Sequence, residues 1–96
     1  MKTANEITPQ KTYHPGIVLG EEIDYRQMTK KEVAAAMKVS PTVLSELISG
    51  KRNFSTAIAI KIEQALGINA LFFLSMQMRH DYYSLKKELK NLKNAA

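Results

Sequence analysis

The spacing of apolar residues is the feature that most constrains the fold of this chain. From Pro15 onward, apolar residues recur every three or four positions, and no window alternates between apolar and polar residues as a strand would. The pattern predicts helices at about residues 15–24, 29–37, 41–49, 55–66 and 69–83. The links between them are short, which is typical of a compact all-α domain.

Capping signals mark the ends of these helices. Thr29 and Glu32 have the spacing of a capping box, in which each side chain bonds a free amide of the other residue. Ser40 is expected to cap the third helix, whose first position holds a proline, and Gly50 is expected to end it in a left-handed conformation. The later boundaries carry the same kinds of residue, namely Ser55, Gly67 and Asn69.

One domain is expected, because a chain of 96 residues has little room for two cores. Residues 1–13 lack helical periodicity and are predicted to be a flexible arm. Residues 14–83 are predicted to form the domain, with a helix-turn-helix at about residues 29–50. Residues 84–96 are predicted to form a lysine-rich helical tail.

Composition argues against several classes of site. The chain contains no cysteine, and its two histidines lie far apart in the sequence without an acidic cluster, so neither a metal site nor another cofactor is expected. No catalytic triad or phosphate-binding loop is recognisable, so the chain is not expected to be an enzyme. No apolar run is long enough to cross a membrane, and the first residues do not resemble a signal peptide, so a cytoplasmic protein is predicted.

Positive charge is concentrated in the middle of the chain. Residues 26–53 contain six lysines and arginines against two glutamates, whereas residues 1–25 carry a net negative charge. A basic segment of this kind favours binding to a polyanion such as DNA. A solvated surface with surplus lysine is the alternative explanation of the charge alone.

The basic segment also has the layout of a helix-turn-helix. Two predicted helices are joined by the short link Lys38-Val39. Ala34, in the predicted helix 29–37, supplies a small residue where the predicted helix 41–49 crosses it. Leu44 and Leu47 of the latter helix supply the apolar contact that fixes the crossing angle. Together with the Gly-Lys-Arg sequence after the second helix, this layout predicts a DNA-binding module.

Residues 14–83 resemble a known family. The likeness to the lambda-repressor-like (XRE) helix-turn-helix domain is carried by the stretch MTKKEVAAAMKVSPTVLSELISGKRNFSTAIAIKIEQALG. The flanks narrow the resemblance to the HigA (VapI-like) antitoxins of bacterial toxin–antitoxin pairs, through HPGIVLGEEI and INALFFLSMQMRHDYY. The resemblance implies a compact five-helix lambda-repressor-like domain with an extended C-terminal helix.

The sequence departs from the family pattern at three positions. Lys38 stands where a glycine usually takes the left-handed conformation, at a cost of about 1 kcal/mol. Lys30 stands where many relatives have a glutamine that contacts DNA, and Phe73 stands where a tryptophan is common. These departures concern base preference and packing rather than the fold.

The outer face of the third helix is the expected DNA-reading surface, because Leu44 and Leu47 face inward. The expected base-facing residues are Thr42, Val43, Ser45, Glu46 and Ser49. The expected phosphate contacts are Lys30, Lys31, Lys51, Arg52 and Asn53. The amides of Thr42 and Val43 are expected to be free to bond a phosphate. Glu46 has two open explanations: it accepts from cytosine N4, or it faces solvent and pairs with a lysine.

A heptad stripe follows on the last helix. The residues Met78, Tyr82, Leu85, Leu89 and Leu92 are spaced four, three, four and three apart. In a parallel pair of helices, this register places Asp81 and Glu88 opposite lysines of the other copy. The alternative is a helix that folds over its own domain or frays after Tyr83. The predicted dimer interface comprises Leu71, Phe72, Leu74, Met78, Tyr82 and Leu85.

The resemblance implies an antitoxin of a type II toxin–antitoxin system. Such a protein represses its own operon as a sequence-specific homodimer on a palindromic DNA operator, and neutralises a small basic ribonuclease toxin of HigB type. The acidic residues Glu21, Glu22 and Asp24 of the first helix are the expected toxin-binding surface. Two alternatives stay open: a stand-alone XRE-type repressor of the prophage kind, and a helical protein-interaction module without DNA binding.

Overall fold

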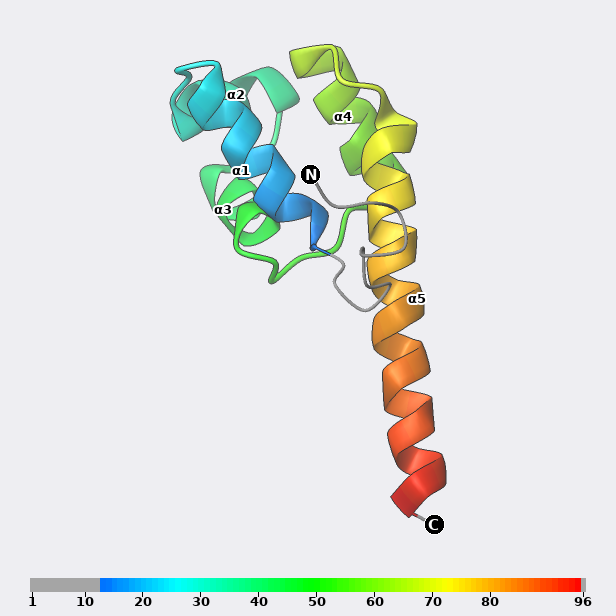
Figure 1. Cartoon of the computed structure of the whole chain (residues 1–96). Coiled ribbons are helices and arrows are strands. Elements are labelled where there is room, and N and C mark those ends of the chain that lie inside the picture. The colour runs from blue at the N-terminus through cyan, green and yellow to red at the C-terminus, as the bar shows by residue number, and fades with distance from the viewer. Residues whose placement is uncertain (1–12, 96) are drawn as a thin grey trace, which may run out of the picture.

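The computed structural model describes residues 13–95, and these residues form an all-α fold (Figure 1). The helices are α1 (Pro15–Tyr25), α2 (Lys30–Met37), α3 (Pro41–Ile48), α4 (Thr56–Leu66) and α5 (Ala70–Ala95). The predicted all-α, five-helix architecture is confirmed. The predicted flexible arm, residues 1–13, lies outside the described residues except for Tyr13.

Side-chain caps begin the central helices at the predicted residues. The Thr29 hydroxyl accepts from the Glu32 amide at 3.1 Å, and the Glu32 carboxylate accepts from the Thr29 amide at 3.4 Å, which completes the capping box. The Ser40 and Ser55 hydroxyls accept from the amides three residues later, each at 3.2 Å. These local bonds satisfy amides that have no partner within the helix.

Left-handed residues end several helices. Gly50 and Gly67 have φ values of 82° and 71°, in agreement with the predicted stops. Lys38 also adopts the left-handed conformation, with φ 59° and ψ 42°, at the position where the family pattern has glycine. Gln27 does the same with φ 57°, which the sequence did not suggest. Two residues other than glycine therefore have a left-handed backbone conformation, which costs about 1 kcal/mol or slightly more for each.

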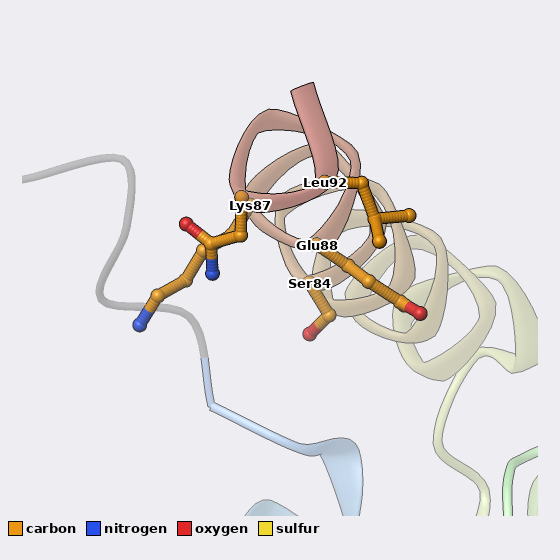
Figure 2. A pocket seen from close by; sticks show the side chains of 5 residues that line it. Ser84, Lys87, Glu88 and Leu92 are labelled. Atoms are coloured by element: carbon orange, nitrogen blue, oxygen red, sulfur yellow. The ribbon is translucent and has the colours of Figure 1, made fainter. Parts of the chain in front are cut away.

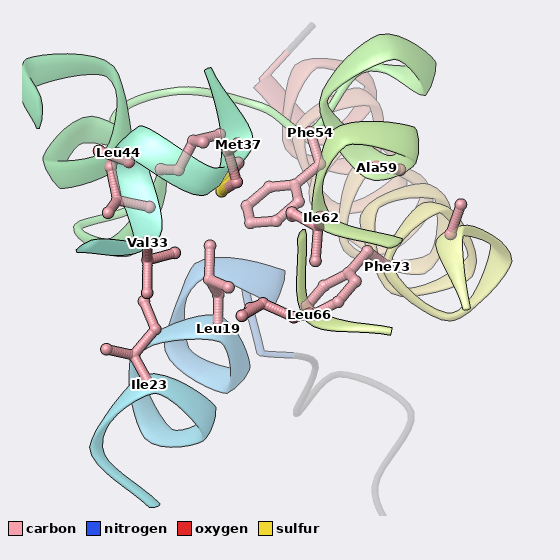
Figure 3. Close-up of a cluster of buried hydrophobic side chains, with 13 residues drawn as sticks. Leu19, Ile23, Val33, Met37, Leu44, Phe54, Ala59, Ile62, Leu66 and Phe73 are labelled. Carbon is pink, nitrogen blue, oxygen red and sulfur yellow. The ribbon is translucent and has the colours of Figure 1, made fainter. Parts of the chain in front are cut away.

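The core lies between α1, α2 and α3 on one side and α4 with the first turns of α5 on the other (Figures 1 and 3). Its buried members are Leu19, Ile23, Val33, Ala34, Met37, Leu44, Leu47, Phe54, Ala59, Ile62, Leu66, Ala70 and Phe73. The rings of Phe54 and Phe73 stack with their centroids 5.5 Å apart. Ile58 and Ala65 of α4 are partly buried and pack against this core.

Gly16 is the point where α1 comes closest to α3. A Cβ atom at this position would overlap the carbonyl oxygen of Leu47 and touch that of Ile48. Only glycine permits this approach. The contact fixes α1 against the C-terminal end of α3 and so helps to set the direction in which the outer face of α3 points.

Helix α5 continues as one helix from the core to Ala95. Figure 1 shows its second half extending away from the other helices. The helix therefore neither frays after Tyr83 nor folds back over its own domain, which were the two alternatives. No helix within residues 13–95 combines the length and apolar character needed to cross a bilayer.

Candidate nucleic-acid interface

The α2–α3 hairpin presents one face of α3 to the outside. Ala34 is 1% exposed at the helix crossing, and its carbonyl accepts from the Val39 amide at 3.0 Å. Leu44 and Leu47 are fully buried and hold α3 against the core. Because these two residues point inward, the residues between them point outward.

An open hollow on the outer face of α3 gathers most of the predicted DNA contacts. It is lined by Lys30, Pro41, Thr42, Ser45, Glu46, Ile48, Ser49 and Lys51. Six of these eight residues were predicted from the sequence. Lys30 comes from α2, Thr42, Ser45 and Glu46 come from α3, and Ser49 and Lys51 follow α3. The hollow therefore combines hydroxyl and carboxylate groups on and just after α3 with Lys30, which precedes them on α2, and Lys51, which follows them in the loop.

Four predicted contacts do not line the hollow, namely Lys31, Val43, Arg52 and Asn53. Lys31 is exposed on α2 without lining the hollow. Val43 is half-buried and packs against the core, so its side chain is only partly available to a thymine methyl group. Asn53 is exposed, and its Oδ1 accepts from Gln77 Nε2 at 3.4 Å. The expectation of a free Val43 amide is wrong, because this amide donates to the Ser40 cap.

Glu46 is linked to the loop that follows its helix. Arg52 Nη2 donates to Glu46 Oε1 at 3.1 Å, with the two side chains 46% and 36% exposed. The Glu46 carbonyl also accepts from the amides of Lys51 and Arg52, at 2.9 and 3.2 Å. Pairing with a basic residue was one of the two explanations left open for Glu46, and the partner is an arginine rather than a lysine. The carboxylate stays partly exposed in this pair and is therefore accessible to a base.

His14 is the N-cap of α1 and contacts the α3–α4 loop through Phe54. Its Nδ1 accepts from the Gly16 amide at 3.0 Å, and its ring contacts those of Phe54 and His80, with centroids 5.9 and 5.1 Å away. Burial lowers the pKa of His14 below 6.5, and His80 lowers it further, while nearby Asn53 and Asp81 oppose the shift. Neutral His14 is thus the form that suits the fold.

Gln77 is a polar residue that the sequence reasoning missed. It is 5% exposed and is hydrogen-bonded to the α3–α4 loop. In the sequence it stands in an apolar stretch of α5, where helical spacing alone gave no sign of its partners. Within residues 13–95, no group of three or more His, Cys, Asp or Glu side chains has a metal-binding arrangement.

The predicted dimer residues lie mostly on the exposed face of α5. Those more than 45% exposed are Leu71, Phe72, Met78, Tyr82 and Leu85, and the stripe continues through Leu89 and Leu92. Leu74 differs, because it is half-buried and packs against the core. Figure 2 shows Glu88 and Leu92 directed to one side of α5 and Lys87 to the other. An amphipathic helix of this kind leaves apolar area uncovered in a single copy.

The predicted toxin-binding acids lie on α1. Glu21 and Asp24 are exposed. Glu22 is half-buried, and its Oε1 accepts from Arg26 Nε at 2.8 Å, which offsets part of its charge. The negative surface of α1 is therefore smaller than the sequence suggests.

Comparison with known proteins identifies the central helices. Residues 24–73 match the helix-turn-helix family. Virulence-associated protein A′ of Dichelobacter nodosus is 33% identical over 69 residues, which make up 71% of this chain and 60% of that protein. The uncharacterized HTH-type transcriptional regulator YddM of Escherichia coli K12 is 30% identical over 63 residues, covering 66% of this chain and 67% of the regulator.

Solved structures with the same fold include two antitoxin-related proteins. A Nostoc punctiforme protein assigned to the antidote proteins of plasmid maintenance systems has a TM-score of 0.77 and 27% identity, covering 88% of this chain and 93% of that one. Pseudomonas aeruginosa antitoxin HigA, solved with the higBA promoter, has a TM-score of 0.72 and 23% identity, covering 88% and 90%. At that identity, the second likeness concerns the fold alone.

Proposed function

The chain belongs to the helix-turn-helix family, and from this premise we propose that it is a sequence-specific DNA-binding antitoxin that represses its own operon. The observation that carries the proposal is the hollow on the outer face of α3, where Lys30 and Lys51 flank the side chains of Thr42, Ser45 and Ser49. Members of this family are transcription regulators and antitoxins rather than enzymes, so no catalytic role is assigned.

The chemistry of the hollow fits a division between phosphate contacts, which position the protein, and base contacts, which specify the sequence. Lysine at its edges neutralises phosphates and positions the protein without specifying sequence. Hydroxyl groups at the centre bond several base edges, and a carboxylate there accepts from cytosine N4 while repelling acceptor edges. The amide of Thr42, next to the proline that begins α3, is the free amide that can meet a phosphate.

A dimer completes the proposed DNA-binding unit. One helix-turn-helix offers few base contacts, and repressors of this type bind paired half-sites of a palindromic operator. The exposed stripe on α5 is the proposed dimer surface, and a parallel pairing matches the charges of Asp81 and Glu88 with lysines on the other copy. The side chain of Lys93, one of these lysines, lies outside the described residues.

The proposed protein partner is a small basic ribonuclease of HigB type. Support comes from the resemblance to antitoxins and from the exposed acids Glu21 and Asp24 on α1. Reversing both charges is expected to weaken toxin neutralisation in a growth-rescue assay, whereas Gln64→Lys, which adds a positive charge at an exposed position of α4, serves as the control. Unchanged neutralisation by the α1 variant would remove this surface from the proposal.

The DNA-binding proposal is tested on the duplex immediately upstream of the protein's own reading frame. A dimer that uses about eight lysines and arginines is expected to show a log–log salt slope of about −7. Lys51→Gln is expected to reduce the slope by about 2 in a dimer, since one contact is lost per copy. Lys87→Gln, on the far side of the tail, is the matched control and is expected to leave the slope unchanged. Absence of binding to any duplex would favour the interaction-module alternative.

A stand-alone repressor is the second candidate, favoured by the likeness to the regulator YddM. It shares the DNA-binding surface and differs only in lacking a toxin partner. The neighbouring reading frame separates the two: a gene for a short basic protein beside this one supports the antitoxin, and a growth defect on expressing that gene alone completes the test.

A further inference from the structure

Gln77 connects α5 to the loop between α3 and α4. Its Oε1 accepts from the Phe54 amide at 2.7 Å, a buried bond between residues 23 positions apart. Its Nε2 donates to Asn53 Oδ1 at 3.4 Å and to Asp81 Oδ1 at 2.9 Å. Within residues 13–92 it is the one buried polar side chain, at 5% exposure. The carboxamide therefore uses its acceptor and its donor group at once.

The loop held by Gln77 carries part of the proposed DNA-binding surface. Lys51 lines the hollow on α3, and Arg52 bonds Glu46 on that helix. Asn53 and Phe54 follow directly and are the two residues that Gln77 contacts. The Phe54 ring is fixed between those of His14 and Phe73. The two anchored residues of the loop thus lie one to three positions from its cationic side chains.

We propose that Gln77 is a positioning residue for DNA binding, which acts by fixing the α3–α4 loop so that Lys51 and Arg52 meet the DNA backbone in a preset geometry. The inference rests on the proposed function, because it concerns the same surface. Gln77 touches no DNA itself. It acts through the Phe54 amide and the Asn53 side chain.

The physical reason is that a buried amide must keep a hydrogen bond. If Gln77 is replaced by an apolar residue, the Phe54 amide loses its acceptor and the loop must open to let water replace it. An opened loop samples several positions, and ordering it again opposes DNA binding. Asp81 adds a second constraint, because its carboxylate accepts from the Gln77 amide one turn further along α5.

The test compares four full-length variants with the wild type. Gln77→Met keeps the volume and removes the hydrogen bonds. Gln77→Glu combined with Asp81→Asn exchanges the acid and the amide, which restores an acceptor for Phe54 and a donor beside it. It is compared with Asp81→Asn alone, because Asp81 is also a proposed dimer contact. Gln64→Met changes an exposed glutamine of α4 and is the matched control. Each is measured by circular dichroism, by the salt dependence of duplex binding, and by hydrogen exchange of the Phe54 amide.

Gln77→Met is expected to stay helical and to lose protection from hydrogen exchange at the Phe54 amide. It is expected to bind duplex at least tenfold more weakly, which is a loss of about 1.4 kcal/mol of binding free energy. The magnitude of its salt slope is expected to fall by as much as about 3 to 4, because Lys51 and Arg52 of both copies in a dimer would lose their phosphate contacts. The exchange variant is expected to recover the Phe54 protection and most of the slope, and Gln64→Met to match the wild type.

Two results would overturn the inference. A folded Gln77→Met chain that binds with the wild-type slope shows that the loop needs no anchor. An exchange variant that folds and protects Phe54 but has a smaller salt slope than Asp81→Asn alone shows that loop fixation is not what places the cations. A wild-type chain that binds no duplex is a different failure, since it removes the proposed function and the inference with it.

Discussion

Arg52 Nη2 lies 3.1 Å from Glu46 Oε1, so the loop after α3 is fastened to the outer face of the helix it follows. The pair joins a cation expected to contact phosphates with the one carboxylate on the proposed reading surface. Partial neutralisation by Arg52 reduces the repulsion between Glu46 and the DNA backbone.

The first prediction concerns base preference. Glu46→Ala is expected to relax the preference for a cytosine at one position of each half-site, worth about 1–3 kcal/mol of discrimination. The free energy of unfolding is expected to fall by less than about 1 kcal/mol, because the ion pair is partly exposed. Selection of bound sites from a randomised duplex library, with a denaturant titration alongside, checks both.

Arg52→Ala is the matched control for Glu46. It breaks the same ion pair but leaves the carboxylate in place, so binding should weaken at every sequence while the cytosine preference persists. If Glu46→Ala selects the same sites as the wild type, Glu46 only fastens the loop.

The second prediction concerns the contact between α1 and α3. Gly16→Ala is expected to lower the free energy of unfolding by about 3 kcal/mol or more, because the new methyl group overlaps the Leu47 carbonyl. Gly20→Ala is the control, since its methyl group meets only the Ile48 Cγ2 atom at 3.1 Å. Thermal unfolding of the two variants should separate them clearly, and equal losses would mean that α1 can shift to accept the methyl group.

The third prediction concerns the left-handed turn at Lys38. Lys38→Gly is expected to raise the free energy of unfolding by about 1 kcal/mol, since glycine takes this conformation without steric cost. Lys38→Ala removes the same charge but keeps a Cβ atom, so it should show no such gain. Urea titrations of both variants give the comparison, and a gain shared by both would assign the effect to charge instead of backbone strain.

The fourth prediction concerns pH. Because burial lowers the pKa of His14 in the folded chain, protonation is more favourable in the unfolded chain. The contribution of His14 to stability is therefore complete above its unfolded value of 6.5 and is lost as the pH falls below 6.5 through the folded pKa. The free energy of unfolding is expected to decline between about pH 7 and pH 5.

The control for this prediction is His14→Asn. Asparagine also caps a helix but does not titrate, so it keeps the bond to the Gly16 amide and removes the pH-dependent part. The slope of unfolding free energy against pH should be shallower in this variant. An unchanged slope would assign the acid sensitivity to other groups.

The fifth prediction concerns the stripe on α5. Leu85→Asn with Leu89→Asn is expected to weaken self-association by about tenfold or more, about 1.4 kcal/mol, without unfolding the domain, because both side chains are more than half exposed. Lys87→Asn, whose side chain points to the other side of α5 from that of Leu92 (Figure 2), should leave association unchanged. Sedimentation equilibrium measures both, and a chain ending at Tyr83 that still dimerised normally would exclude the tail.

The helix boundaries could be predicted from the sequence because their causes are local. The capping box joins Thr29 and Glu32, three residues apart, and the Ser40 cap reaches the Val43 amide at the same separation. Such bonds depend on neighbouring residues alone. The inward placement of Leu44 and Leu47 also followed from helical spacing, and with it the outer face of α3.

Helical spacing was less reliable for residues at the edge of that face. Val43 belongs to the outward arc of α3 by periodicity, yet it is half-buried against the core. Its amide also bonds Ser40, so it is not free for a phosphate. The angle at which α3 meets its neighbours decides how much of each edge residue is covered, and that angle depends on contacts such as Gly16 against Leu47.

By itself, the sequence determined an all-α chain, the ends of its helices and the group of residues that share the outer face of α3, because periodicity and capping act within one or two turns. Only the tertiary structure decided the partners of Gln77, Glu46 and His14. The bond from Phe54 to Gln77 spans 23 residues and forms only when α5 packs beside the α3–α4 loop. Partners at that separation depend on helix packing, which local spacing does not encode.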